Sequence, residues 1–222
     1  MTSPSIAAQP RYQCHWGTLP YFSDLREKPC RSVNSKDRAN MTPSGYMAKR
    51  VSSRPEWLKA ERVSDIYSVS NCMSTEFADY INYWQHNGYW FFDSPEIIRQ
   101  VVKEHSLDLA DTSLFYYEVH ELEFDENEAL WKPFVPEPSF TTRIIEPKTK
   151  NLEGYDVVTF YVRTSPGCSP LSCNSLATEV ETNQHCLLSS LEQAQQMLEQ
   201  GKFKGTEPGP YRIFAVYSVQ WP

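Results

Sequence analysis

The chain has 222 residues, which is long enough to bury a full hydrophobic core as one large domain or as two small ones. Its hydrophobic fraction of 40% is typical of a folded globular protein. The formal net charge of −7 argues against general nucleic-acid binding, because that affinity depends on lysine and arginine side chains that neutralise phosphates.

No apolar stretch of the sequence approaches the roughly 20 residues that a membrane-spanning helix requires. The segment from Met1 to Pro10 lacks the basic and apolar regions of a secretory signal. We therefore expect a soluble cytoplasmic protein with no membrane association. In that compartment the six cysteines are expected to stay reduced.

Residues 1–62 have the weakest hydrophobic periodicity in the chain. Proline recurs through this segment together with serine, asparagine and basic residues, a composition that interrupts regular structure. Aromatic residues such as Tyr12 and Trp16 are too apolar for a simple linker. We predict an irregular N-terminal arm that packs on the body of the protein.

The first part of the body has the pattern of a strand, a helix and a second strand. A short strand is predicted near Asp65–Ser70, and a helical turn is predicted over Phe77–Trp84. Ser94 is a natural N-cap, and the apolar residues that follow it at helical spacing predict a helix over about 95–105. Alternating apolar residues predict a strand at Leu114–Leu122.

A proline-rich connection over residues 125–152 separates this pattern from a second one. The second pattern predicts strands at Tyr155–Arg163 and Tyr211–Val219, with a helix over about 190–200 between them. The last strand is apolar on both faces, which predicts a central position in the sheet.

The two patterns resemble each other. Residues 88–122 and 184–218 show an apolar run, a capped helix and an aromatic strand in the same order, 96 positions apart. This shift places Val101 on Met197, so the buried pattern is kept, whereas few residues are identical. We interpret the segments as two pseudo-duplicated units; the alternative is that a common strand–helix–strand pattern simply occurs twice.

The predicted fold class is α+β, with a mixed or antiparallel sheet and a few short helices. The arm over residues 1–62 precedes an α+β body over residues 63–222. Within the body, the two pseudo-repeat units cover about 63–124 and 153–222.

One loop offers residues for nucleophilic chemistry. Cys173 lies in a segment rich in serine and asparagine, and His185 follows it. A cysteine beside a histidine is the pair that thiol enzymes use, because the imidazole accepts the thiol proton. We expect no metal ion; the alternative is a zinc site formed by Cys168, Cys173 and Cys186, whose spacing differs from that of the usual Cys-x2-Cys knuckle.

No other catalytic motif is present. The sequence has no glycine-rich phosphate loop, no His-Glu-x-x-His motif and no Gly-x-Ser-x-Gly elbow, and we expect no cofactor. The expected function is that of a soluble acidic binding or interaction module of the inhibitor, immunity or adaptor type. The alternative is a thiol-dependent small-molecule enzyme or hydrolase that uses the Cys173 loop.

Aromatic and polar side chains occur together in two loop regions of the sequence. Tryptophan and tyrosine anchor many interfaces and small-ligand clefts, while amide and imidazole groups give them specificity. The residues expected to contact a protein partner or a small polar ligand are Cys72, Trp84, His86, Asn87, Tyr161, Arg163, Asn174 and Ser175.

Overall fold

The computed structural model describes residues 40–70, 87–138, 140–160 and 167–222. The chain divides into two compact units, Met1–Cys30 and Arg31–Pro222, and every described residue lies in the second. The described strands are β1 (Met41–Arg50), β2 (Ser52–Ser53), β3 (Asp65–Ile66), β4 (Thr112–Asp125), β5 (Leu130–Pro133), β6 (Asn151–Thr159) and β7 (Tyr211–Val219). The described helices are α1 (Pro95–His105), α2 (Pro170–Cys173), the 3₁₀ turn η4 (Leu176–Thr178) and α3 (Leu191–Glu199).

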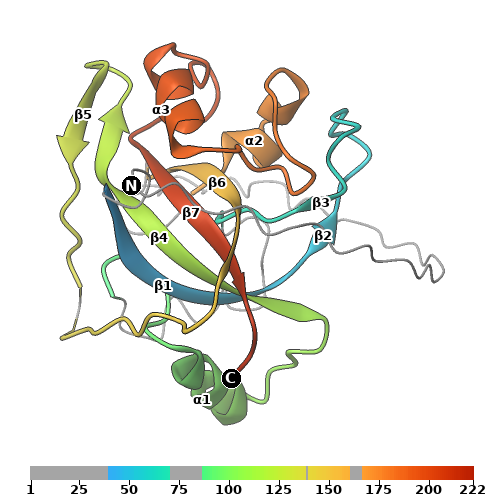
Figure 1. Cartoon of the computed structure of the whole chain (residues 1–222), viewed down its shortest axis with the longest axis vertical. Helices are drawn as coiled ribbons and strands as arrows, with labels where there is room; N and C mark the ends of the chain where they lie inside the picture. Colours follow the sequence, from blue (N-terminus) through green and yellow to red (C-terminus); the bar gives the residue numbers. More distant parts are fainter. Residues whose placement is uncertain (1–39, 71–86, 139, 161–166) are drawn as a thin grey trace, which may run out of the picture. The chain divides into compact units, whose positions relative to one another are not determined.

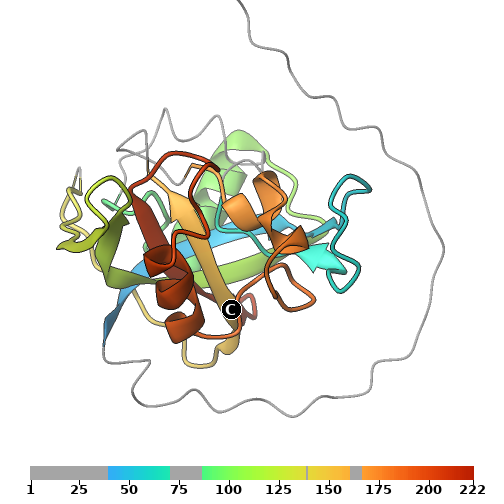
Figure 2. The ribbon, with the colours of Figure 1, turned by 90° about the horizontal axis from the view of Figure 1, so that it is seen from above.

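The main sheet is antiparallel. Strands β1, β4, β7 and β6 pair in that order, and β5 pairs with β4. Strand β7 therefore lies between β4 and β6, the central position that its sequence predicts. Figure 1 shows α1 and α3 at opposite ends of β4 and β7, and in Figure 2 the strands separate the two helices. The predicted α+β class is confirmed.

The two long helices begin close to the predicted positions. Helix α1 runs from Pro95 to His105, and helix α3 begins at Leu191, where the Ser190 hydroxyl accepts a hydrogen bond from the backbone N–H of Gln193 at 3.1 Å. The apolar stripe of α3 is buried and that of α1 is buried or half-buried against the core, because each helix presents one face to the body of the protein. No helix in the described ranges is long and apolar enough to cross a membrane.

Strand β1 was not predicted, because residues 41–50 fall inside the segment expected to be an irregular arm. Pro43 and Gly45 interrupt its alternation, yet the residues after Gly45 are buried in the core. The strand predicted near Asp65–Ser70 is wrong in length, since only Asp65 and Ile66 pair as a strand. The predicted turn at Phe77–Trp84 lies outside the described residues.

One tight turn, residues 87–92, is held by a buried asparagine. The side-chain carbonyl of Asn87 accepts hydrogen bonds from the backbone N–H groups of Tyr89 and Phe91, at 3.0 and 3.3 Å. Its NH₂ group donates to the carbonyl of Ser44 in β1, at 3.0 Å. The side chain thus fixes the turn and attaches it to the strand. We call this segment the first hooked turn.

Residues 183–188 form a second hooked turn with the same hydrogen bonds. The side-chain carbonyl of Asn183 accepts from the backbone N–H groups of His185 and Leu187, at 2.9 and 3.1 Å. Its NH₂ group donates to the carbonyl of Glu153 in β6, at 2.6 Å. In both turns the fourth residue has a left-handed backbone, with φ of 66° and 61°.

Each hooked turn covers an outer strand of the sheet. Tyr46 of β1 and Phe92 exchange two backbone hydrogen bonds, at 2.8 and 3.0 Å. Tyr155 of β6 and Leu188 exchange the equivalent two, at 2.9 and 2.8 Å. The exposed row of donors and acceptors that an open edge strand presents is therefore interrupted on both sides of the sheet.

The close approach of turn and strand requires glycine in each strand. Gly45 and Gly154 both have positive φ, of 124° and 150°, and each lies at a shift in the strand register. A Cβ atom on Gly45 would lie 2.6 Å from the carbonyl oxygen of Phe92, and one on Gly154 would lie 2.7 Å from the Cβ of Leu187. A side chain would be strained at either position.

The strand ladder is symmetric about one pair of residues. Gly45 faces Tyr117 across β1 and β4, and Gly154 faces Val216 across β6 and β7. Tyr117 and Val216 are themselves paired across β4 and β7. An approximate twofold axis therefore passes through this central pair, and it relates β1, the first hooked turn, α1 and β4 to β6, the second hooked turn, α3 and β7.

Candidate binding site

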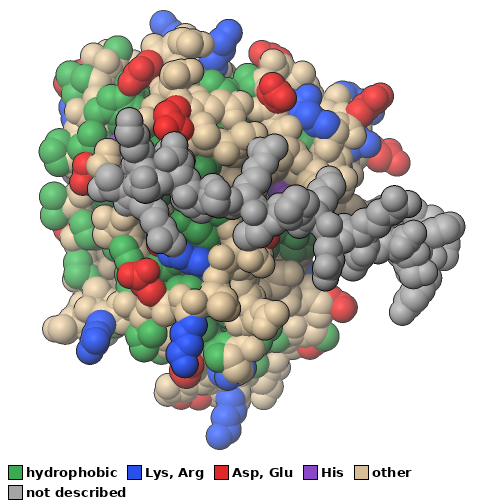
Figure 3. All heavy atoms as spheres, in the orientation of Figure 1, with side chains coloured by type: hydrophobic (Ala, Val, Ile, Leu, Met, Phe, Trp, Pro, Cys, Tyr) green, Lys and Arg blue, Asp and Glu red, His purple; other side chains and the backbone are tan. Residues whose placement is uncertain are grey.

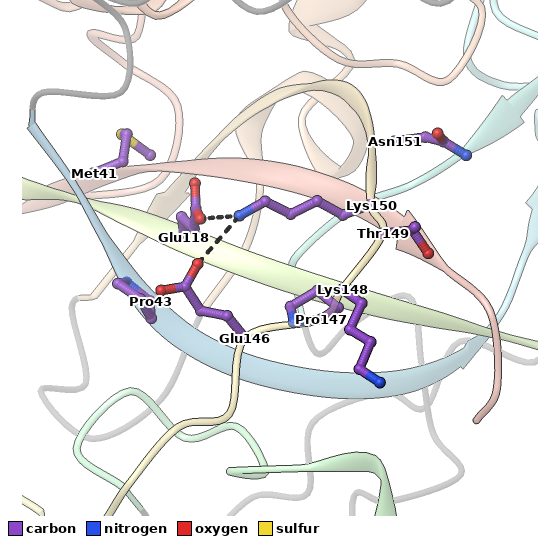
Figure 4. Close-up of a pocket in the computed structure, with 9 residues that line it drawn as sticks. All are labelled: Met41, Pro43, Glu118, Glu146, Pro147, Lys148, Thr149, Lys150 and Asn151. Carbon is purple, nitrogen blue, oxygen red and sulfur yellow. Dashed lines mark hydrogen bonds and ion pairs between the residues drawn. The ribbon is translucent and has the colours of Figure 1, made fainter.

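A cleft opens where β1 begins and where the chain enters β6. Its volume is about 580 Å³, which falls in the range of roughly 300 to 1,000 Å³ that small-molecule sites occupy. Figure 4 shows its walls: the start of β1, Glu118 of β4 and the segment of residues 146–151. Most of the lining side chains are polar or charged, so the cleft suits a polar ligand.

A buried ion pair lies at one side of the cleft. The Lys150 ammonium donates to one carboxylate oxygen of Glu118, and the Tyr217 hydroxyl donates to the other at 2.7 Å. The ammonium also lies 4.8 Å from the ring centre of Tyr116 and 4.5 Å from that of Tyr217. Because a carboxylate and two aromatic faces hold the cation, its position is fixed before any ligand arrives.

Tyr116 beside the cation stays neutral. Burial raises the pKa of Tyr116 well above its usual range, and the neighbouring Glu118 carboxylate raises it further. The buried Tyr116 hydroxyl has no hydrogen-bond partner within the part of the chain that the structure describes. Tyr46, whose ring lies 5.0 Å from that of Tyr116, donates its hydroxyl to the carbonyl of Ile145 at 2.5 Å.

Two charged side chains of the cleft are much more open to solvent. The Glu146 carboxylate is 60% exposed and lies 3.8 Å from the Lys150 ammonium, beyond hydrogen-bond distance. The Lys148 side chain is exposed and has no hydrogen-bond or ion-pair partner among the described residues. The cleft therefore combines a fixed, buried ion pair with one accessible negative group and one accessible positive group.

The cleft lies beside the approximate twofold axis. In the ladder Pro43 faces Glu118, and Leu152 faces Tyr217, so that Glu118 and Tyr217 occupy equivalent positions. These two residues differ in chemistry and bond to each other. No protein-family model, curated protein or solved structure matches this chain. The chemistry of the cleft is therefore the guide to function.

A second polar group lies where two loops meet. The buried Asp156 carboxylate of β6 accepts hydrogen bonds from the Ser68 hydroxyl at 3.1 Å, the Val69 backbone N–H at 2.8 Å and the Ser169 hydroxyl at 2.5 Å. Ser68 and Val69 follow β3, and Ser169 belongs to the loop that contains Cys173. Asp156 thus joins the two loops.

The charged groups of this cluster are committed to internal contacts. The buried Lys49 ammonium donates to the carbonyls of Ser68, Val69 and Ser70, at 2.9, 2.9 and 3.0 Å. Because these bonds use its three hydrogens, Lys49 has no free donor for a ligand. Burial raises the pKa of Asp156 to about 6, against the opposing effect of its hydrogen bonds and of Lys49.

The structure does not bring the two catalytic candidates together. The Cys173 sulfur is half-buried and lies 3.9 Å from the Ser70 hydroxyl oxygen. The His185 imidazole places Nδ1 2.5 Å from a carboxylate oxygen of Asp65 and Nε2 3.7 Å from one of Glu153. The imidazole is thus held between two carboxylates, and the thiol is not among its partners.

The cysteines of the alternative zinc site differ in burial. Cys168 and Cys173 are half-buried, and Cys186 is buried. Burial raises the pKa of Cys186 to about 12, which disfavours the thiolate that a metal needs. No group of three His, Cys, Asp or Glu side chains among the residues with described positions is arranged to hold a metal ion.

The residues predicted to contact a partner fall into three groups in the structure. Asn87 is buried and its amide is used by the first hooked turn, so the prediction that it contacts a partner is corrected to an internal role. Asn174 is exposed and donates to Glu207 at 3.2 Å, while the Ser175 carbonyl accepts from Thr178. The remaining predicted residues, Cys72, Trp84, His86, Tyr161 and Arg163, lie outside the described part of the chain.

Sequence reasoning missed the charged residues of both polar groups. Glu118 alternates with the buried residues of β4, so the pattern alone assigns it to solvent. The signal that identifies it is Tyr116, because an aromatic residue on the same face indicates that this face is also covered. Lys49 and Asp156 gave no such signal, since Lys49 stands in a segment expected to be irregular and Asp156 stands in an ordinary predicted strand.

Proposed function

We propose that this protein is a binding module without catalytic activity, and that its ligand is a compact polar molecule held in the cleft beside Glu118 and Lys150. The observation that carries the proposal is the cleft itself, about 580 Å³ in volume, with a buried ion pair at one side and accessible charges at its rim. A site with fixed charges binds polar ligands with little reorganisation.

A small molecule is a better candidate ligand for this protein than another macromolecule is. The hooked turns interrupt the free edges of β1 and β6, which argues against a partner that adds a strand there. On the face drawn in Figure 3, acidic and basic side chains are interspersed, so a partner of a single charge sign finds no matching field on it. The net charge of −7 disfavours nucleic acid as a ligand.

The alternative of a thiol enzyme has less support. It needs a base near the Cys173 sulfur, and the His185 imidazole is engaged with Asp65 and Glu153 instead. The sequence shows no export signal and its cysteines do not form a small disulfide scaffold, and we include a cytoplasmic location in the proposal.

We also propose that the body arose by internal duplication. Two hooked turns with equivalent asparagine hydrogen bonds, two glycines at equivalent register shifts and two helices at equivalent positions support this origin. A cleft beside the axis then lies between the two halves, a common place for ligand sites.

The test is a ligand titration followed by NMR of the backbone amides in the full chain. Three probes represent three classes of polar ligand: alanyl-alanine, citrate and glucose. We expect at least one probe to shift the amide signals of residues 146–151. The variant Asn151→Trp, which fills an exposed position of the cleft wall and leaves the buried ion pair intact, should abolish the shifts.

A matched control variant tests whether the signal shifts depend on the cleft. Lys132→Met removes an exposed lysine of the β4–β5 hairpin, outside the cleft, and should leave the titration unchanged. The proposal is wrong if none of the probes shifts these signals at millimolar concentration, or if Asn151→Trp binds as the natural protein does.

A further inference from the structure

From the two accessible charges of the cleft, we infer that its ligand is a zwitterion of short-peptide size, with a terminal ammonium that pairs with Glu146 and a terminal carboxylate that pairs with Lys148. This inference rests on the proposed binding function and names the class of ligand. It follows from which charges of the cleft are buried in close contacts and which are open to solvent.

The satisfied charges belong to the buried ion pair. The Glu118 carboxylate accepts from both Lys150 and Tyr217, and its side chain is only 8% exposed. Lys150 is 12% exposed and is compensated by Glu118. A ligand gains little by competing with these contacts, because it would have to replace a partner that is already desolvated and in place.

The two charges that are open to solvent are of opposite sign. Lys148 has no ion-pair partner among the described residues, and Glu146 lies 3.8 Å from the Lys150 ammonium while most of its surface faces solvent. A ligand with a single charge pairs with one of these groups and brings nothing to the other. A ligand with both charges pairs with each, and its own net charge stays zero.

The arrangement of the two groups sets the separation of the ligand charges. Figure 4 shows the Glu146 carboxylate directed towards Lys150 and Glu118, whereas the Lys148 side chain leaves the same segment in a different direction. Pro147 lies between them in the chain, and Pro43 of β1 lies beside Glu146 in the cleft wall. A ligand that reaches both charged groups therefore has its charges apart, with an uncharged portion between them.

A short peptide meets these requirements. Its termini carry the two charges, its central amide offers one donor and one acceptor, and small apolar side chains suit the walls that Met41 and the two prolines supply. The Thr149 hydroxyl and the Asn151 amide, drawn on the side of Figure 4 away from Met41 and Pro43, add polar groups to the lining. The volume of about 580 Å³ leaves room for a dipeptide together with bound water.

The experiment uses one dipeptide and two blocked forms of it. Alanyl-alanine carries both charges, N-acetylalanyl-alanine lacks the ammonium, and alanyl-alaninamide lacks the carboxylate. Each is titrated against the full-length natural protein and against Glu146→Gln and Lys148→Met. Both substitutions change exposed side chains, so the variants should fold as the natural protein does.

We expect each blocked form to bind the natural protein about fivefold more weakly than the parent dipeptide, as the loss of one solvent-exposed ion pair predicts. Acetylation should have no effect on binding to Glu146→Gln, and amidation should have no effect on binding to Lys148→Met. Acetylation should still weaken binding to Lys148→Met, because Glu146 is intact in that variant.

Two results distinguish a wrong assignment of the ligand class from a wrong assignment of the binding function. If both blocked forms bind the natural protein as tightly as the parent, or if citrate or glucose binds the cleft and the dipeptide does not, the zwitterion assignment is overturned while the binding function stands. If no probe of any class binds, the binding function itself fails.

Discussion

Replacement of Asp156 by Asn should change how the stability of the protein depends on pH. Asp156 is fully buried, and burial raises the pKa of its carboxyl from the ordinary value of 3.8 to about 6. Asparagine has nearly the same shape and no titratable group. Its carbonyl can accept from Val69 and Ser68, while its NH₂ group can donate to the Ser169 hydroxyl oxygen.

The sign of the effect follows from the raised pKa. Between pH 3.8 and about 6 the folded protein holds the Asp156 proton more often than the unfolded chain does, so stability falls as pH rises. The contribution is complete below the unfolded value and is lost once pH exceeds the folded value. The gap between 3.8 and about 6 corresponds to about 3 kcal/mol, at about 1.36 kcal/mol per pKa unit.

The assay is urea unfolding followed by tryptophan fluorescence at several pH values from 4 to 7. The free energy of unfolding is extrapolated to water for the natural protein and for Asp156→Asn, and the difference is taken at each pH. This subtraction cancels the other carboxylates. We expect the natural protein to lose about 2 kcal/mol relative to the variant from pH 4 to pH 7, because at pH 4 most unfolded chains have already released this proton.

Asp125→Asn provides a control of opposite sign. A hydrogen bond from Lys132 lowers the pKa of the Asp125 carboxyl, so its contribution is present at neutral pH and declines as pH falls. A difference for Asp156→Asn that is constant across the range would refute the reasoning. So would a difference that grows in favour of the natural protein as pH rises, since Lys49 would then dominate over burial.

Three further predictions concern the scaffold and the thiols. Gly154→Ala should lower the free energy of unfolding by about 2–4 kcal/mol, against about 1 kcal/mol for Gly201→Ala, whose added Cβ meets open space. Asn87→Ala leaves two buried N–H groups and one carbonyl without their partner, and urea unfolding should show a loss of roughly 3 kcal/mol. Iodoacetamide should label Cys173 faster than Cys186 in the folded protein, and equal rates by mass spectrometry would contradict the burial argument.

The elements that could be predicted are those with local signals. Helix α1 begins after Ser94 with Pro95 and carries its apolar stripe on one face, so its limits can be read from neighbouring residues. Strand β7 has a continuous apolar run, and its central position follows because both of its faces are covered. The residues within each of these two elements are therefore enough to predict it.

The elements that could not be predicted depend on contacts with distant residues. Strand β1 contains Pro43 and Gly45, which argue against a strand, and it is a strand because it pairs with β4 and needs glycine where the first hooked turn approaches. Asn87 lies in an aromatic and polar stretch of sequence that is typical of a ligand-binding loop. It is buried where its side chain donates to the carbonyl of Ser44, which is far away in the sequence. A polar side chain in the sequence does not show whether it faces solvent or the backbone.

The approximate twofold axis explains why the charges gather where they do. Away from the axis the hooked turn occurs twice, and Asn87 and Asn183 keep the same role because the hydrogen bonds that they have in common are to backbone groups. Beside the axis a residue of one half contacts the equivalent residue of the other half. Two identical charged residues there would repel each other. Glu118 and Tyr217 avoid this by being different, acceptor against donor, and the carboxylate left on one side is what holds the Lys150 ammonium in the cleft. The asymmetry of a single pair thus places a fixed charge at the junction of the two halves.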